Sequence, residues 1–356
     1  MTRYFSDKIR VLSLVGVILV MYIHAAFRDR PDEIAGMAAN HVLQGIISGE
    51  IGWLAVPLFF AISGFLFFRD IDAGAPRADC YAALWGKMKR RCRTLAVPYA
   101  IACLFPAALR LALEQIPAAA PFTNGNGFSE NFSKTVPQLL YMIYVDSGDS
   151  RPYAFHLWFL RDLMVIIALS PVLLAIKRLG DHWVRALVTV LFAVNTACPH
   201  TPGFVYGLFW FMAGDAYLSR LSRTKTWAVP AAFVTLCAAE TLFPEEWWVY
   251  WRMVIITLGV ATVWTTYDWL VPQTFTLSSV AWLNTACAYT FFIYLYHIPT
   301  ISIVKKLLLL PLGHTSAAFA LSYLVTPFVF TAIWVLAGMA FRRLLPRVYS
   351  VCMGGR

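Results

Sequence analysis

Long apolar stretches separated by short polar or proline-containing turns run along the whole chain. A membrane-spanning helix needs roughly 20 apolar residues, and a helix satisfies its own backbone hydrogen bonds in lipid. On this rule the sequence predicts an all-α, polytopic transmembrane helix bundle, a single domain over residues 1–356. Ten spans are expected, at residues 9–28, 50–68, 94–113, 156–176, 183–199, 203–219, 226–243, 249–267, 279–300 and 316–341.

The Lys and Arg positions orient this bundle, because cytoplasmic loops of membrane proteins carry an excess of positive charge. With a cytoplasmic N-terminus, 20 of the 29 Lys and Arg residues fall on the cytoplasmic side. We therefore expect both termini in the cytoplasm and the protein in the plasma (inner) membrane. These cations form five groups, at residues 3–10, 69–93, 177–185, 220–225 and 342–356.

Two connections between predicted spans are long. Residues 69–93 are expected as a cytoplasmic loop that ends in a basic run, and residues 114–155 as an outer loop. Long loops of compact proteins often bind ligands or cover sites. Within the outer loop, residues 136–145 are apolar but too short to span, which predicts an interfacial or re-entrant helix.

Composition agrees with a membrane protein and excludes other classes. The chain is 60% hydrophobic and 13% charged, with a mean hydropathy of +0.65, whereas soluble chains are about 45–50% apolar and about 25% charged. The net charge of +10 comes from cations at the ends of apolar segments, so it indicates topology rather than nucleic-acid binding. Seven cysteines without paired or metal-ligand spacing predict neither a disulfide framework nor a metal site.

His24 lies near the end of the first predicted span, and an ionisable group at membrane depth is read as functional by default. Arg10 precedes it by fourteen residues. On a helix the two side chains share one face about 21 Å apart, which suggests a channel for a long anionic ligand. An unprotonated imidazole is the usual general base near neutral pH. The alternative is a helix-end histidine that is hydrogen-bonded to a neighbour.

A basic cluster at residues 87–93 precedes the third predicted span and includes Lys89. Arg90 and Arg93 have an Arg-x-x-Arg spacing, and residues three apart are neighbours on a helix, so the two guanidiniums can grip one polyphosphate. Cations that only set membrane orientation would give the same pattern.

Further polar residues mark the fourth and ninth spans. His156, Trp158, Arg161 and Asp162 open the fourth, and His297 lies in the ninth. Side chains at adjacent helical positions point about 100° apart, so Arg161 and Asp162 are each expected to find a partner on another helix. All five residues either bind a polar acceptor or make structural contacts, and for His297 we favour the structural role.

Several short segments, in order along most of the chain, resemble the acyltransferase-3 family of membrane acyltransferases, which modify sugars, glycans and lipids. Each segment alone is weak evidence for the family, but the ordered set together with ten spans is specific for it. The segments are residues 7–10 with His24, 56–65, the basic run before 97–99, 156–160 leading to 170–171, and 292–297.

The resemblance implies an enzyme that transfers an acyl group, commonly acetyl from acetyl-coenzyme A as co-substrate, to a hydroxyl of a sugar, glycan or lipid-linked acceptor. It implies no bound cofactor. His24 matches the general base of the family, Arg10 the cation before it, and Arg90 with Arg93 the Arg-x-x-Arg linked to the donor. One departure is that thirteen residues separate Arg10 from His24, where the family has about ten. The difference is close to one helical turn, about 4.5 Å.

The competing function is a transporter or flippase for a glycan or lipid-linked sugar, in which the same polar residues would line a path. Transporters often carry repeated halves with broken helices, and the sequence has no such repeat. A passive structural membrane protein is a third possibility, but it leaves His24, Arg161 and Asp162 at membrane depth without a role.

Overall fold

The computed structural model describes residues 2–27, 36–119, 127–198, 201–221, 227–239 and 245–355. Helices occupy most of this part of the chain, and no strand occurs within it. The all-α prediction is therefore confirmed. The first half contains α1 (Arg3–Ala25), α2 (Met37–Gln44), α3 (Ala55–Phe68), α4 (Arg77–Arg91), α5 (Val97–Glu114), α7 (Val136–Tyr144), α8 (Trp158–Ala168) and α9 (Ser170–Leu179).

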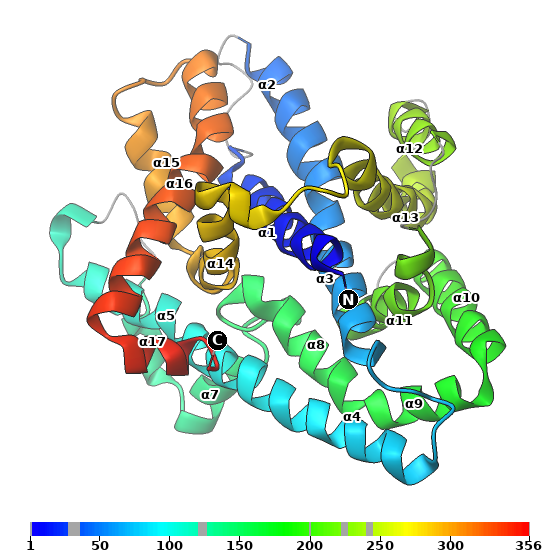
Figure 1. Cartoon of the computed structure of the whole chain (residues 1–356). Helices are drawn as coiled ribbons and strands as arrows, with labels where there is room; N and C mark the ends of the chain where they lie inside the picture. The colour runs from blue at the N-terminus through cyan, green and yellow to red at the C-terminus, as the bar shows by residue number, and fades with distance from the viewer. Residues whose placement is uncertain are drawn as a thin grey trace. The chain divides into compact units, whose positions relative to one another are not determined.

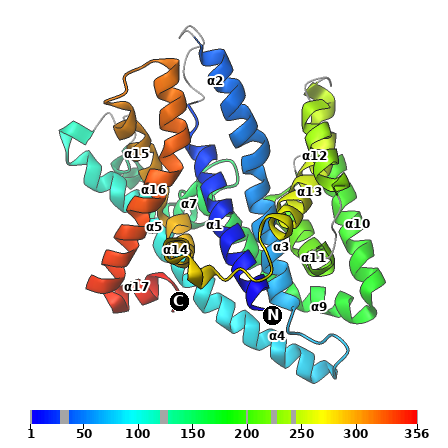
Figure 2. The same ribbon diagram turned by 45° about the horizontal axis from the view of Figure 1, so that its top comes forward.

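The described residues of the second half contain eight further helices, and Figures 1 and 2 show how the helices are arranged. The eight helices are α10 (Asp181–Ala197), α11 (Gly203–Leu221), α12 (Ala228–Ala239), α13 (Glu245–Leu270), α14 (Ala281–Tyr296), α15 (Thr300–Leu309), α16 (Ser316–Leu344) and α17 (Pro346–Cys352).

Every one of the ten predicted spans coincides with a helix, although not every helix has the length and composition of a complete span. Among the described residues, five helices are long and apolar enough to cross a membrane, and up to seven if each bent pair counts as one span. The chain is therefore an integral membrane protein. The helices α10, α11 and α12, predicted as three spans, do not meet this measure. The outer end of the third of these, residues 240–243, lies outside the described residues.

Two predicted spans are bent. The fourth is broken between α8 and α9 by 55°, and the ninth between α14 and α15 by 100°. Pro299 explains the second break, because proline has no backbone N–H and its ring clashes with the preceding helical turn. The helix α15 that follows was not predicted.

The long connections contain more helix than expected. Residues 69–93 were predicted as a loop, but α4 occupies residues 77–91 and runs through a π-helical segment (Cys92–Ala96) into α5. That prediction was wrong, because basic residues with an amphipathic spacing form helices as readily as loops. The helix expected at residues 136–145 is confirmed as α7.

The chain divides into two compact units, each built from separate segments. Unit 1 comprises residues 1–20, 45–89 and 165–288, and unit 2 comprises residues 21–44, 90–164 and 289–356. In unit 1, α3 packs on α11, and α10 and α13 pack beside them. In unit 2, α16 packs on α15 and α17, and α5 on α7 and α17.

Glycines set the spacing of the closest helix pair in unit 1. A Cβ at Gly64 of α3 would collide with the carbonyl oxygen of Phe211, and one at Gly214 of α11 with the carbonyl oxygen of Ala61. The two backbones therefore touch directly, an approach that small residues allow between membrane helices.

Candidate active site

Three histidines from distant parts of the sequence meet in unit 2. His24 is in the last turn of α1, His156 in the short 3-10 segment before α8, and His297 between α14 and α15. The ring centroids of His24 and His297 are 5.3 Å apart, and those of His156 and His297 are 4.7 Å apart. His297, for which we favoured a structural role, is the residue that contacts both of the others.

Backbone carbonyls fix the two buried rings. Nδ1 of His297 lies 2.8 Å from the carbonyl oxygen of Tyr294, and Nε2 of His156 lies 3.1 Å from that of Leu295. A carbonyl oxygen only accepts hydrogen bonds, so each of these ring nitrogens carries the proton. The break after α14 leaves the carbonyls of its last turn without intrahelical partners, which is why they are available to the imidazoles.

The opposite nitrogens of these rings are unsatisfied. Nε2 of His297 and Nδ1 of His156 are buried and have no hydrogen-bond partner among the described residues. In a neutral imidazole the nitrogen without a proton is an acceptor. A buried acceptor without a donor costs free energy, so two of them within one cluster indicate a place where a ligand or a neighbouring side chain is meant to bind.

His24 is the accessible member of the cluster. Its side chain is half-buried, whereas His156 is 5% and His297 0% exposed. The Phe155 ring packs against it edge-on at 5.4 Å between centroids. An imidazole that is reachable from outside and backed by a buried acceptor is suited to take a proton from a substrate.

Arg161 and Asp162 pair with each other, which corrects the prediction that Asp162 would find a partner on another helix, whereas Arg161 also reaches the end of α7. Nε and Nη2 of Arg161 lie 2.9 and 2.8 Å from Oδ1 of Asp162, and Nη1 donates to the carbonyl of Val145 at 2.7 Å. The long arginine side chain curls back over its neighbour, so the 100° between their Cα–Cβ directions is no obstacle. Oδ2 of Asp162 is buried without a partner among the described residues.

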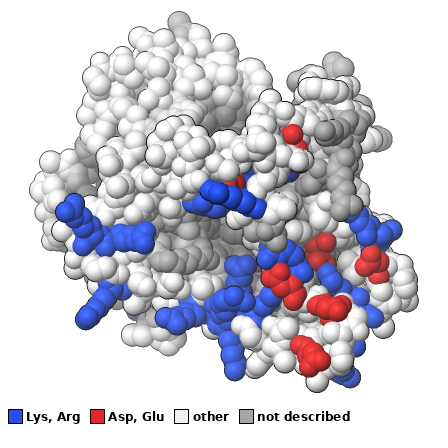
Figure 3. Space-filling model, viewed as in Figure 1, with Lys and Arg blue, Asp and Glu red and all other residues white. Residues whose placement is uncertain are grey.

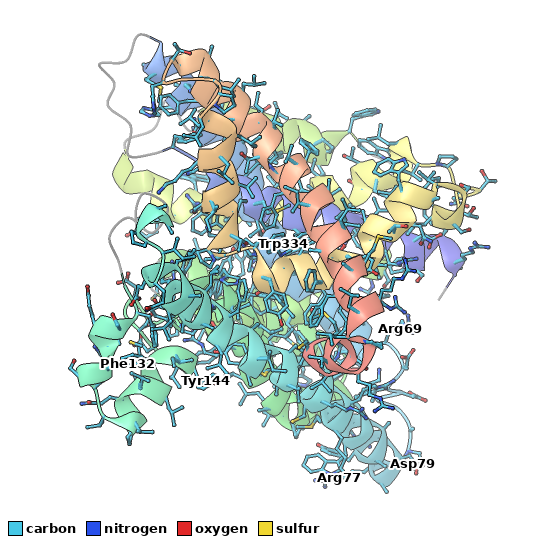
Figure 4. The ribbon with its side chains drawn as sticks, turned by 90° about the vertical axis from the view of Figure 1, so that its left-hand side faces the viewer. Arg69, Arg77, Asp79, Phe132, Tyr144 and Trp334 are labelled. Carbon is cyan, nitrogen blue, oxygen red and sulfur yellow. The ribbon has the colours of Figure 1, made fainter. Side chains whose placement is uncertain are left out.

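The surroundings of this pair are aromatic. Trp158 is half-buried and stands one turn before Asp162 on α8. Tyr99 of α5 donates its hydroxyl to the carbonyl of Tyr144, at 2.6 Å. Figure 4 shows Tyr144 at the end of α7.

The cations predicted to bind a donor are exposed. Lys89 and Arg90 are in the last turn of α4, and Arg93 is in the π-helical segment that follows. The side chains of Arg90 and Arg93 are exposed and have no hydrogen-bond or ion-pair partner within the part of the chain that the structure describes. The wider π turn rotates Arg93 less per residue than an α-helix would, so the pair is not the plain i, i+3 neighbour pair expected.

The C-terminal tail packs against the same segment of unit 2. A Cβ on Gly354 would be 2.7 Å from Cα of Thr94, whereas a Cβ on Gly355 would be 3.7 Å from Nη2 of Arg93. Both glycines have positive φ, +67° and +81°, which favours glycine over other residues. The tail therefore lies over the backbone that carries Arg93.

Arg10 belongs to unit 1 and has partners there. Its Nη2 donates to Oδ1 of Asn284 at 2.9 Å, and Asp7 is 4.0 Å from its Nη1. The side chain is still 39% exposed, so it retains donors for a ligand.

One buried charge in unit 1 was not predicted from the sequence. Lys8 was grouped with the cations that set orientation, yet its side chain is 0% exposed and its Nζ lies 2.6 Å from Oδ2 of Asp268. The same Nζ lies 3.9 Å from the centroid of the Trp264 ring. No local pattern marks this pair, because its two members come from opposite ends of the chain.

The histidine cluster is not a metal centre of the usual kind. Within the described ranges, no group of three or more His, Cys, Asp and Glu residues could hold a metal ion. Two of the three rings use a nitrogen on a backbone carbonyl. Each of these two rings keeps its other nitrogen as an acceptor, and an imidazole of this kind is suited to proton transfer.

Comparisons with known proteins identify the family of the chain. A family model described as an acyltransferase domain matches residues 3–340. The succinoglycan biosynthesis protein ExoH of Rhizobium meliloti (strain 1021) is 25% identical over 374 residues, which cover 99% of this chain and 92% of that protein. No solved structure matches the chain significantly.

Proposed function

This chain belongs to the acyltransferase-3 family, and from that premise we propose that it moves an acyl group from acyl-coenzyme A to a hydroxyl of a glycan, with His24 as the general base. The histidine cluster carries the proposal, because it places an accessible imidazole against a buried acceptor nitrogen. Family membership favours this enzyme over the transporter or flippase considered from the sequence.

The proposed reaction is a direct transfer. His24 takes the proton of the acceptor hydroxyl as its oxygen attacks the thioester carbonyl. The carbon–sulfur bond breaks, the coenzyme A thiolate leaves and receives a proton, and an ester remains on the acceptor. Help of this kind from a general base is typically worth about 10²–10⁴-fold in rate.

His297 is proposed as the positioning residue of His24. Its Nδ1 is tied to the Tyr294 carbonyl, so its Nε2 has a fixed direction within the cluster. By accepting an N–H from His24, that nitrogen would set which nitrogen of His24 is free to act as base, and would stabilise the imidazolium that forms. An orienting partner of this sort is a general feature of activated bases.

The donor is proposed to bind through its phosphates to Arg90 and Arg93, with Lys89 and Arg10 as further cations. Guanidiniums whose side chains have no partner among the described residues are suited to phosphate oxygens, because each offers a fork of donors. Acetyl is the acyl group that we expect, and succinyl is the one to test beside it.

The acceptor is proposed to be a polysaccharide or its lipid-linked precursor, since the relative in Rhizobium meliloti is named for succinoglycan biosynthesis. Oδ2 of Asp162 is an acceptor for a sugar hydroxyl, and Trp158 and His156 are candidates to line the same site. The single domain, the cytoplasmic termini and a place in the inner membrane belong to this proposal.

The test compares two histidine variants of the detergent-purified protein. Release of coenzyme A from acetyl- and succinyl-coenzyme A is followed in the presence of surface polysaccharide from a deletion strain. We expect His24→Ala to lose about 10²–10⁴-fold in rate, and His182→Ala, an exposed histidine on α10, to match the wild type. A His24→Ala protein that transfers at the wild-type rate would refute the assignment.

A further inference from the structure

Unit 1 has a partly open cavity of about 450 Å³ between α3, α10, α11 and α13. Its walls are almost entirely apolar, with Val188, Phe209, Ala213 and Val260 among them. The hydroxyl of Thr257, which also faces the cavity, already donates to a backbone carbonyl. Nε1 of Trp210, another lining residue, is buried without a hydrogen-bond partner among the described residues. The walls therefore suit a ligand that is largely apolar.

A shift of α11 toward α3 cannot close the cavity. The α3–α11 pair is already in backbone contact at Gly64 and Gly214, so α11 has no room to move toward α3. Largely apolar walls offer water few hydrogen-bond partners. In a membrane protein the available apolar filler is a lipid hydrocarbon chain.

One end of the cavity is charged. Arg220 lines it and lies 3.2 Å from Asp181, which also faces Arg185 at 4.0 Å. These side chains are 52%, 76% and 50% exposed, respectively. The nearby Lys177 and Asp215 pair with each other at 2.5 Å. Two exposed cations thus share one carboxylate, and the end of the cavity keeps a net positive charge.

This end has the character of a membrane surface. Charged side chains gather over the part of unit 1 that holds α4 and α9 (Figure 3), and α10 begins directly after α9 with Asp181 and an exposed Trp183. Tryptophan is enriched at the headgroup level of membranes. The orientation predicted from Lys and Arg puts this end on the cytoplasmic side, where lipid headgroups are often anionic.

We infer that the cavity binds an anionic glycerophospholipid, with an acyl chain between α3, α10, α11 and α13 and its phosphodiester on Arg220. An apolar space of fixed size and a cation at its mouth match the two halves of such a lipid. The site is separate from the proposed acyl transfer, because no residue assigned to that reaction lines it.

Lipid binding to the full-length protein in neutral detergent tests the inference. Native mass spectrometry and thermal midpoints are measured with phosphatidylglycerol, with phosphatidylcholine of the same chains, and with glycerol phosphate. We expect phosphatidylglycerol to bind about five- to tenfold more tightly than phosphatidylcholine. Glycerol phosphate should have no effect, since it has no chain.

Two variants locate the binding. Arg220→Gln should remove the preference for phosphatidylglycerol while Arg343→Gln, an exposed cation near the end of α16, keeps it. Ala213→Phe should fill the cavity and weaken both lipids. Equal affinity for the two lipids in the wild type, or a preference retained in Arg220→Gln, would overturn the inference. If Ala213→Phe does not fold, Arg220→Gln decides alone.

Discussion

Two buried polar sites, one in each unit, differ in how completely their hydrogen bonds are satisfied. In unit 1, both carboxylate oxygens of Asp268 are used, one by Lys8 at 2.6 Å and the other by the hydroxyl of Tyr4 at 2.9 Å. In unit 2, His297 and His156 each keep one buried nitrogen without a described partner. Native structures rarely leave such groups unpaired. The site of unit 1, in which both carboxylate oxygens are paired, is the closed site and is expected to stabilise the fold. The site of unit 2 is the open site and is the one proposed to bind a reactant.

The largest effect expected from this contrast is on stability. Asp268→Asn removes the charge that compensates Lys8, and an uncompensated buried charge costs about 3–5 kcal/mol. The thermal midpoint of the purified protein should fall, while the rate per folded molecule stays at the wild-type value. Because a buried ion pair is often replaceable by apolar residues, the double variant Lys8→Met with Asp268→Leu should recover most of the midpoint. An unchanged midpoint in Asp268→Asn would show that the closed site is not stabilising.

A substitution in the histidine cluster, the open site, should lower the catalytic rate and leave the stability of the fold unchanged. In His297→Asn, the side-chain amide can still donate to the Tyr294 carbonyl, but the acceptor at Nε2 is lost. A hydrogen bond to a charged group is worth about 1.5–3 kcal/mol, so kcat should fall about 10–100-fold. The donor KM and the thermal midpoint should remain at their wild-type values.

A purely structural His297 would give the opposite pattern, a lower midpoint with kcat per folded molecule intact. Steady-state kinetics on purified His297→Asn, with the folded fraction measured on the same sample, distinguishes the two.

The same contrast explains what the sequence predicted and what it did not. Apolar runs located a helix at every predicted span, because burial in lipid and backbone hydrogen bonding are local requirements. The partners of His24 and Lys8 could not be predicted, since each comes from a segment far along the chain. Neither the 100° bend between α14 and α15 nor the contact of His297 with His24 was predicted, because both depend on tertiary packing.

Arg161 shows a different limit. The helical geometry of neighbouring positions was applied correctly, but it describes Cα–Cβ directions, and an arginine side chain is long enough to return to Asp162. Helix spacing predicts the position of short side chains better than the charged end of long ones.

The basic run at residues 87–93 also contains both kinds of side chain, those with protein partners and those without a described partner. Substitutions there are expected to have smaller effects. Lys87 has protein partners: its Nζ donates to the Phe67 carbonyl at 2.7 Å and to Asp70 at 3.4 Å. The side chains of Arg90 and Arg93 have no hydrogen-bond or ion-pair partner among the described residues. Figure 4 shows that Arg77 and Asp79 lie at the other end of α4, so variants there supply exposed controls on the same helix.

Arg90→Ala and Arg93→Ala should each raise the apparent KM for acyl-coenzyme A about five- to tenfold, since one phosphate contact of about 1–1.4 kcal/mol is lost. Acceptor KM should not change. Lys87→Ala should instead lower the thermal midpoint and leave the donor KM unchanged. Arg77→Ala should also leave the donor KM unchanged. A donor KM that rises equally in Lys87→Ala would mean that the whole basic run acts only through its net charge.

The smallest effect is expected from the tail that covers Arg93, and two adjacent glycines make it measurable. Both Gly354→Ala and Gly355→Ala put a side chain at positive φ, at a similar cost of about 1–2 kcal/mol. Only at Gly354 does the new Cβ also press on the backbone, 2.7 Å from Cα of Thr94, whereas at Gly355 the nearest atom is 3.7 Å away. Gly354→Ala should therefore displace the tail from the Arg93 segment and change the donor KM about two- to threefold, a difference of about 0.4–0.7 kcal/mol. Gly355→Ala should share the loss of stability without the change in KM. Equal donor KM values for the two variants would show that the tail does not position Arg93.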